Sequence, residues 1–189
     1  NPAARPGVKV AVFGCGGVGL NVIQGANLVG ASRIIAIDVV DHKLEFAYKF
    51  GATDVINSRD VDVVEAIKDL TGDGVDIAVD SFGGVQVITD AVSALRRGGT
   101  AVMVGLVPVG ATAAVDVVDM IRAQKSLVGS YYGSASPHQT FEKLVNYYLR
   151  GRIDVGGLIT REYQLDQLNE GFEALEAGED GRGVVVFGP

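Results

Sequence analysis

The chain has 189 residues but a single cysteine, Cys15, and only two histidines, His42 and His138. One cysteine excludes an internal disulfide and is typical of a reducing compartment, so we expect a cytoplasmic protein. The two histidines are far apart in sequence and cannot complete a Cys/His zinc site, so we expect no metal ligand in this chain. We interpret Cys15 as a small packing residue and both histidines as solvated side chains near helix starts.

Basic clusters and long apolar runs are also missing. Lysine and arginine total 16 against 23 acidic residues, a net charge of −7, and no basic cluster could neutralise a run of phosphates. This argues against a nucleic-acid partner. No apolar run approaches the roughly 18 residues that a membrane span needs. Residues 1–6 lack the apolar centre of a signal peptide, and the first residue is Asn1 rather than Met, so we expect a piece of a longer protein.

Glycine is abundant, with 26 residues, and its densest cluster is the segment 14–19, Gly-Cys-Gly-Gly-Val-Gly. An apolar run, 8–13, precedes this cluster, and a helix-like segment, 20–28, follows it. A second apolar run, 33–37, ends in Asp38. Strand, glycines, helix, strand and acid in this order predict a dinucleotide site, whereas the glycine pattern alone would be a weak signal.

Each glycine of the pattern has a physical reason in such a site. Gly14 allows a tight turn out of the strand, and Gly16 lets the backbone approach a pyrophosphate closely. Gly19 lets the helix pack against the strand, while the free N–H groups at the helix start face the phosphates. Asp38 can accept hydrogen bonds from the hydroxyls of the adenosine ribose.

Apolar runs and helix-like segments alternate along most of the chain. Runs rich in valine, isoleucine and alanine, separated by helices, are typical of a parallel sheet that is covered on both faces. We therefore predict an α/β fold with a doubly wound, six-stranded parallel sheet in the order 3-2-1-4-5-6. The expected strands are 8–13, 33–38, 54–56, 75–80, 100–104 and 126–131. The expected helices are 20–28, 41–50, 61–70, 85–95 (ended by Gly98 and Gly99) and 117–123.

The C-terminal part has a different organisation. Helices are expected at 140–149 and 165–177, and strands at 158–163 and 183–187. These strands follow the completed six-stranded set, so we expect them in a separate sheet whose other strands are absent from this chain. We therefore divide the chain into a dinucleotide-binding domain, 1–135, and a short C-terminal α+β extension, 136–189.

The chain resembles the zinc-type medium-chain alcohol dehydrogenases over essentially its whole length. In that family a GroES-like domain precedes this segment and carries the catalytic zinc ligands, and no such segment is present here. The resemblance therefore implies the cofactor-binding half of an enzyme, inactive alone. The matching segments, in order, are Pro6–Leu20, Ile35–Asp38 with Lys43, Lys49–Asp54, Val75–Asp80, Gly98–Gly105, Leu158–Thr160, Leu168–Phe172 and Gly181–Gly183.

The resemblance also implies roles for individual residues. Asp38 would select NAD over NADP, because a 2′-phosphate beside a carboxylate brings two anions together. Lys43 would be a second ribose contact or an ordinary exposed lysine, and Arg182 would reach the pyrophosphate or be solvated. Ser81, with Phe82, would wall the adenine side or only pack. The pyrophosphate turn would comprise Gly14, Gly16, Gly17, Val18 and Gly19, and the nicotinamide contact would comprise Val104, Gly105 and Leu106, with Tyr131 and Tyr132 near it.

The implied reaction is reversible hydride transfer between a small alcohol and NAD, which gives an aldehyde or ketone. Zinc in the parent enzyme would polarise the substrate oxygen. Family members associate through the edge of the sheet, and strand 126–131 contains no proline or charge to block pairing, so we expect a homodimer.

Specific residues argue against other function classes. No tyrosine is followed by lysine four positions later, which excludes the short-chain dehydrogenases. A methyltransferase is disfavoured by the third glycine of the turn and by the six helix-separated strands. A zinc-independent quinone or enoyl reductase would lack an acid at position 38 and prefer NADP. A non-catalytic NAD-binding module stays open, and the upstream sequence would decide.

Overall fold

The computed structural model describes residues 4–178 and 182–188. The chain separates into two compact units, Asn1–Phe141 and Glu142–Pro189, and each is described by itself. The division into domains 1–135 and 136–189 that the sequence suggests stays a prediction.

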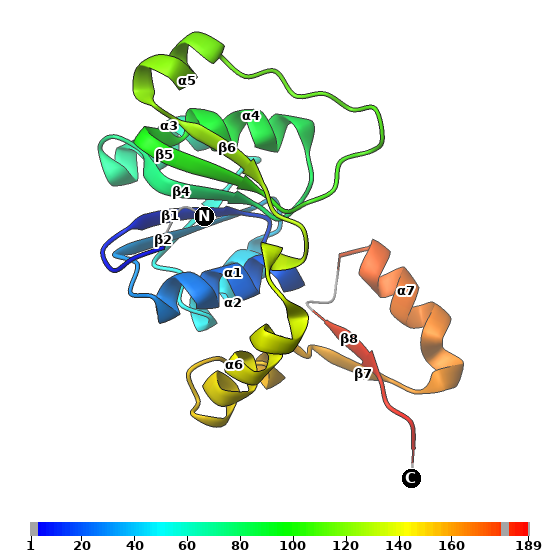
Figure 1. Cartoon of the computed structure of the whole chain (residues 1–189). Coiled ribbons are helices and arrows are strands. Elements are labelled where there is room, and N and C mark those ends of the chain that lie inside the picture. Colours follow the sequence, from blue (N-terminus) through cyan, green and yellow to red (C-terminus); the bar gives the residue numbers. More distant parts are fainter. Residues whose placement is uncertain (1–3, 179–181, 189) are drawn as a thin grey trace. The chain divides into compact units, whose positions relative to one another are not determined.

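The first unit is built on a six-stranded parallel sheet in the order β3-β2-β1-β4-β5-β6. This confirms the predicted fold class and strand order. Helices α1 and α2 cover one face of the sheet, and α3, α4 and α5 lie on the other (Figure 1). The strands are β1 (Lys9–Phe13), β2 (Arg33–Asp38), β3 (Asp54–Asn57), β4 (Val75–Asp80), β5 (Leu95–Met103) and β6 (Ser126–Gly129). The helices are α1 (Gly17–Leu28), α2 (Asp41–Lys49), α3 (Val63–Thr71), α4 (Val85–Ser93) and α5 (Val117–Ala123).

Both faces of the central strand β1 are buried, as its continuous apolar sequence predicts. Ala11 and Phe13 belong to a core cluster that also contains Ile67 of α3 and Val92 of α4. The alternate residues of β1 point to the opposite face, where α1 packs with Leu20 and other buried side chains. The sheet is thus held between two layers of helices.

The start of β5 differs from the prediction. Helix α4 ends at Ser93 and β5 begins at Leu95, so the predicted helix to 95 and strand from 100 were wrong there. Leu95 is buried and pairs with Val75, and the register shifts between Val75 and Ile77. This irregularity lets the glycine pair at 98–99 lie inside the strand rather than end a helix.

Several other boundaries shift, among them the start of α3 and the end of β6. Helix α3 begins at Val63, two residues later than predicted, because Asp62 caps it by accepting a hydrogen bond from Glu65 N–H. Strand β6 stops at Gly129, and a short 3₁₀ turn, η1 (Tyr132–Ser134), follows.

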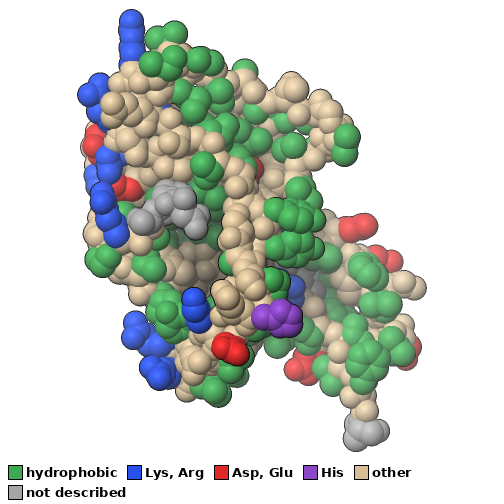
Figure 2. All heavy atoms as spheres, in the orientation of Figure 1, with side chains coloured by type: hydrophobic (Ala, Val, Ile, Leu, Met, Phe, Trp, Pro, Cys, Tyr) green, Lys and Arg blue, Asp and Glu red, His purple; other side chains and the backbone are tan. Residues whose placement is uncertain are grey.

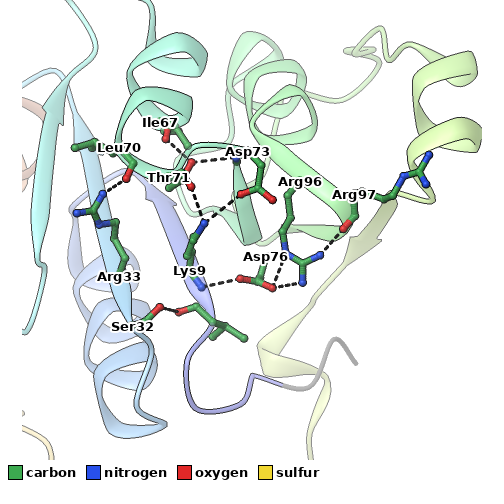
Figure 3. A network of polar contacts seen from close by, with 12 residues as sticks. Lys9, Ser32, Arg33, Ile67, Leu70, Thr71, Asp73, Asp76, Arg96 and Arg97 are labelled. Carbon is green, nitrogen blue, oxygen red and sulfur yellow. Dashed lines mark hydrogen bonds and ion pairs between the residues drawn. The ribbon is translucent and has the colours of Figure 1, made fainter.

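The amino ends of the strands are tied together by ion pairs and hydrogen bonds (Figure 3). Lys9 N–H donates to Asp76 Oδ2 at 2.8 Å, and Arg96 Nε donates to Asp76 Oδ1 at 2.8 Å. The Lys9 ammonium also pairs with Asp73 at 3.1 Å. Figure 2 shows Lys and Arg side chains gathered along the edge of the first unit where the strands begin. These cations therefore lie at the end of the sheet opposite the glycine turn.

The second unit contains a separate two-stranded parallel sheet, β7-β8, which confirms that these strands lie outside the six-stranded set. Its buried side chains include Leu158, Tyr163 and Ala174. Both strands are shorter than predicted, and Leu158 lies in a 3₁₀ turn instead. The elements from the end of the first unit onward are α6 (Pro137–Leu149), η2 (Gly156–Leu158), β7 (Arg161–Tyr163), η3 (Leu165–Gln167), α7 (Leu168–Glu176) and β8 (Gly183–Val185).

Candidate dinucleotide site

The glycine turn connects β1 to α1 at the carboxyl end of the sheet. Gly14 adopts φ +92°, a conformation that favours glycine, and its N–H donates to Ile37 O at 2.8 Å. Gly16 is the residue before α1, and no side chain caps the helix start. The first N–H groups of α1 are therefore available to an anion.

The fold requires glycine at position 19 but not at position 16 of the turn. A Cβ at Gly19 would overlap the carbonyl oxygen of Gly14 and lie 2.8 Å from Ser81 Oγ, so the packing of α1 against the turn requires glycine. A Cβ at Gly16 would meet no atom within 4 Å, and its φ of −79° suits any residue. The fold itself therefore does not require glycine at position 16.

Asp38, the last residue of β2, lies beside this turn. Its Oδ2 accepts a hydrogen bond from Cys15 N–H at 2.7 Å. Its Oδ1 accepts from Val39 N–H at 2.8 Å and from Val40 N–H at 3.1 Å. Three backbone donors thus fix the carboxylate next to the glycine turn.

Cys15 packs under the turn. The residue is 2% exposed, and its Sγ donates to Ile37 O at 3.7 Å. Burial, together with the nearby Asp38 carboxylate, raises the pKa of the thiol to about 12. The thiol is therefore neutral at ordinary pH, which agrees with a packing role and not with a reactive one.

A cavity of about 600 Å³ opens beside the turn, at the carboxyl ends of β1, β2 and β4. Sequence reasoning missed four polar residues that also line it, Ser58, Asp62, Gln86 and Asp90. Ser58 follows β3, Asp62 precedes α3, and Gln86 and Asp90 lie one turn apart in α4. No motif marks these residues. The candidate residues that the cavity brings together are Gly14, Gly16, Asp38, Lys43 and Ser81. Those outside its lining are Gly17, Val18, Gly19, Val104, Gly105, Leu106 and Arg182.

Ser81 links β4 to the glycine turn. Its Oγ lies 2.9 Å from the carbonyl oxygens of both Phe13 and Gly14. This contact joins the segment after β4 to the turn after β1. Ser81 therefore has a definite structural role, in addition to lining the cavity.

The segments that follow β4 and β5 touch through their backbones. Gly83 has φ +92°, and a Cβ there would overlap the backbone of Leu106. A Cβ at Gly105 would in turn overlap Gly83. Two glycines thus allow the segment containing Val104, Gly105 and Leu106 to lie against the segment after β4, although no local sequence pattern relates them.

Arg182 lies in the second unit, where its backbone is fixed and its side chain is exposed. Its N–H donates to Thr160 Oγ1 at 3.2 Å, and its carbonyl accepts from Thr160 N–H at 3.0 Å. These bonds precede the pairing of β7 with β8. Its expected contact with a pyrophosphate stays a prediction.

The described part of the chain holds neither a cluster of metal ligands nor a helix that could span a membrane. Within residues 4–178 and 182–188, no three His, Cys, Asp or Glu side chains are grouped so as to hold a metal ion. Within the same residues, no helix combines the length and apolar character needed to cross a membrane.

The sheet order, the glycine turn after the first strand and the acid after the second define a doubly wound domain of the dinucleotide-binding class. The sequence profile described as zinc-binding dehydrogenase matches residues 17–149. The chain belongs to this family.

The relatives agree with this assignment. The chain is 36% identical to an alcohol dehydrogenase class-3 of Cereibacter sphaeroides, covering 96% of this chain and 50% of that protein. It is 35% identical to an S-(hydroxymethyl)glutathione dehydrogenase of Paracoccus denitrificans, with the same coverage. The chain spans about half the length of the curated relatives it matches.

Solved structures show the same fold. The benzyl alcohol dehydrogenase of Acinetobacter calcoaceticus superposes with a TM-score of 0.95 at 34% identity, covering 98% of this chain and 51% of that one. A zinc-binding dehydrogenase of Sinorhizobium meliloti, solved bound to NADP, superposes with a TM-score of 0.83 at 27% identity, covering 89% of this chain and 49% of that one.

Proposed function

We propose that this chain is the NAD-binding portion of a zinc-dependent alcohol dehydrogenase. The observation that carries the proposal is the open space at Gly16, beside a cavity that Asp38 also lines. The fold gives no reason for glycine at position 16, whereas close approach of a pyrophosphate does. The parent enzyme would interconvert a small alcohol and its aldehyde or ketone.

The residues present fit a dinucleotide. The turn of Gly14, Gly16, Gly17, Val18 and Gly19 would hold the pyrophosphate, and Asp38 and Lys43 would hold the adenosine ribose. Ser81 would border the adenine pocket, and Val104, Gly105 and Leu106 would border the nicotinamide, with Arg182 reaching the pyrophosphate. Bound NAD would supply the hydride acceptor, while these residues would orient it.

The proposal includes a preference for NAD over NADP that depends on a single residue, Asp38. A 2′-phosphate on the ribose would stand beside the Asp38 carboxylate, which brings two anions together. Because the Sinorhizobium meliloti relative was solved bound to NADP, the preference of this chain has to be measured. Titration of this chain with NADH and NADPH by calorimetry tests it. We expect NADH to bind more tightly, and Asp38→Ser to lower NADH affinity about tenfold while narrowing the preference, since a hydrogen bond to a charged group contributes roughly 1.5–3 kcal/mol. Equal or tighter binding of NADPH to the unchanged chain would refute the role of Asp38.

In the proposed enzyme, the ligands of the catalytic zinc would come from residues outside this chain. One cysteine and two separated histidines do not fit a catalytic zinc site, so this chain would bind and orient the cofactor and would supply no zinc ligand. We propose that the chain alone does not oxidise alcohols. Turnover of a simple alcohol, or one tightly bound zinc per chain by metal analysis, would contradict this. A zinc-independent reductase or a non-catalytic NAD-binding module stays the alternative, and a Cys/His ligand set upstream would exclude both.

We further propose a cytoplasmic homodimer that forms through β6. This strand is the last in the sheet order, its four residues are exposed, and it carries no charge or proline. Ser130 N–H donates to Met103 of β5. Residues an odd number of positions away point their N–H groups the other way, so Leu127 N–H faces the free edge. The single cysteine favours the reducing cytoplasm.

The dimer is tested by light scattering at micromolar concentration. We expect Leu127→Pro to give monomers, because it removes an edge donor. Leu127→Ala keeps the N–H and serves as the matched control, which should remain dimeric. A monomeric unchanged chain would refute pairing through β6.

A further inference from the structure

The buried carboxylate of Asp80 is not among the residues that we propose to contact the cofactor. Asp80, the last residue of β4, is 0% exposed, and it is the only acidic side chain buried among the described residues. Its Oδ1 accepts hydrogen bonds from Phe82 N–H at 2.9 Å and Gly83 N–H at 2.8 Å. Its Oδ2 has no hydrogen-bond partner within residues 4–178 and 182–188. A carboxylate is costly to bury, so the acceptor function of Oδ1 must serve a purpose that an apolar side chain could not.

Asp80 holds two segments at once. Its side chain fixes the turn at Gly83, and its backbone carbonyl accepts from Val104 N–H and Gly105 N–H, both at 2.9 Å. Gly83 in turn lies against the backbone of Leu106, with no room for a Cβ. The position of the segment 104–106 therefore depends on both the Asp80 carbonyl and Gly83, and the position of Gly83 depends on the Asp80 side chain.

These segments lie in the second half of the sheet. In doubly wound sheets a dinucleotide crosses the switch point in strand order, with one nucleoside over each half. The first half has its own anchors here, because Gly14 N–H donates to Ile37 O and Cys15 N–H donates to Asp38. Neither anchor involves Asp80. Ser81, at the adenine side, is held separately by hydrogen bonds from its Oγ to Phe13 O and Gly14 O. Loss of the Asp80 carboxylate would therefore disturb mainly the second half.

We propose that Asp80 is a positioning residue for the nicotinamide half of the cofactor, which it acts on through Gly83 and the segment 104–106. This rests on the proposed function, since it presumes that the chain binds NAD. The essential property is a hydrogen-bond acceptor at Oδ1, because that atom alone receives both turn N–H groups.

The test compares two ligands on variants of this chain. NADH reports both halves of the site and AMP reports the adenosine half, each measured by calorimetry. We expect Asp80→Ala to weaken NADH binding about tenfold or more and AMP binding less than about threefold, because the turn at Gly83 would no longer hold the segment 104–106 in place. In Asp80→Asn the ratio of NADH affinity to AMP affinity should equal that of the unchanged chain, because the amide oxygen can accept the same two N–H groups.

Two further variants separate positioning from general loss of stability. Val75→Ala removes buried side-chain atoms at the opposite end of β4 and should lower stability without changing the NADH/AMP ratio. Gly83→Ala leaves Asp80 intact but pushes on Leu106, so it should reproduce the selective loss of NADH. If Asp80→Ala does not fold, the NADH and AMP affinities of Gly83→Ala test the positioning role instead.

The outcomes are distinct. Equal weakening of NADH and AMP in Asp80→Ala and in Gly83→Ala would overturn the positioning role, as would an asparagine variant with a ratio as low as that of alanine. Failure of the unchanged chain to bind NADH would instead overturn the proposed function.

Discussion

The packing of α1 on the glycine turn gives a prediction in which two glycines of one helix behave oppositely. Gly19 and Gly25 both lie in α1, but a Cβ at Gly25 would meet nothing within 4 Å, whereas at Gly19 it would overlap Gly14 O and approach Ser81 Oγ to 2.8 Å. Gly25→Ala should therefore stabilise the chain by up to about 1 kcal/mol through helix propensity alone.

Gly19→Ala gains the same propensity but forces α1 away from the turn. Overpacking costs typically about 1–3 kcal/mol, and here the overlap is with backbone, which cannot rotate away. We expect a net loss of roughly 1–2 kcal/mol, so the two variants should differ by about 2–3 kcal/mol in unfolding free energy. Urea denaturation followed by circular dichroism measures both. Equal stability of the two variants would refute the claim that close helix–strand approach requires Gly19.

Two further predictions concern titratable groups. With a pKa of about 12, Cys15 has on the order of 10⁻⁴ of its thiol ionised at pH 8, so Ellman's reagent should react far more slowly with the folded chain than with the chain in urea; equal rates would contradict its burial. For Asp76, partial burial acts to raise the pKa, but the hydrogen bonds from Lys9 and Arg96 and the Arg96 charge outweigh it, and the pKa is lowered. A lowered folded pKa contributes stability above the unfolded value of roughly 4 and loses it as the pH falls through the folded value. Asp76→Asn should thus destabilise the chain by about 1 kcal/mol at pH 7 and by less in acid, and a pH-independent difference in denaturation free energy would count against this assignment.

The order of the six strands could be predicted from sequence because local signals agreed. The glycine turn fixes which strand is central, and the apolar runs of β1, β2 and β4 show that the sheet is buried on both faces. The same motif predicted that Asp38 ends the second strand, which is where β2 ends. These features depend on residues near one another in the chain.

The features that were missed depend on distant backbone contacts. Leu95 begins β5 because it pairs with Val75, and the register shift that permits this has no sequence signature. The contact of Gly83 with Gly105 and Leu106 is also long-range. The sequence shows that Asp80 is an acid at the end of the apolar run of β4. Its hydrogen-bond donors, Phe82 N–H and Gly83 N–H, are identified only from the structure of the turn after β4. Strands β7 and β8 pair over three residues each, too few for apolar alternation to define their ends.

The central claim is that position 16 is glycine for the ligand and not for the fold, and Gly16→Ala tests it most directly. Nothing lies within 4 Å of the added Cβ, and φ is ordinary. The change from glycine to alanine at a helix N-cap should therefore alter unfolding free energy by less than about 1 kcal/mol. We predict near-normal stability together with a loss of NADH affinity of about tenfold or more, measured by calorimetry on the same sample. A variant that binds NADH as tightly as the unchanged chain would contradict the account.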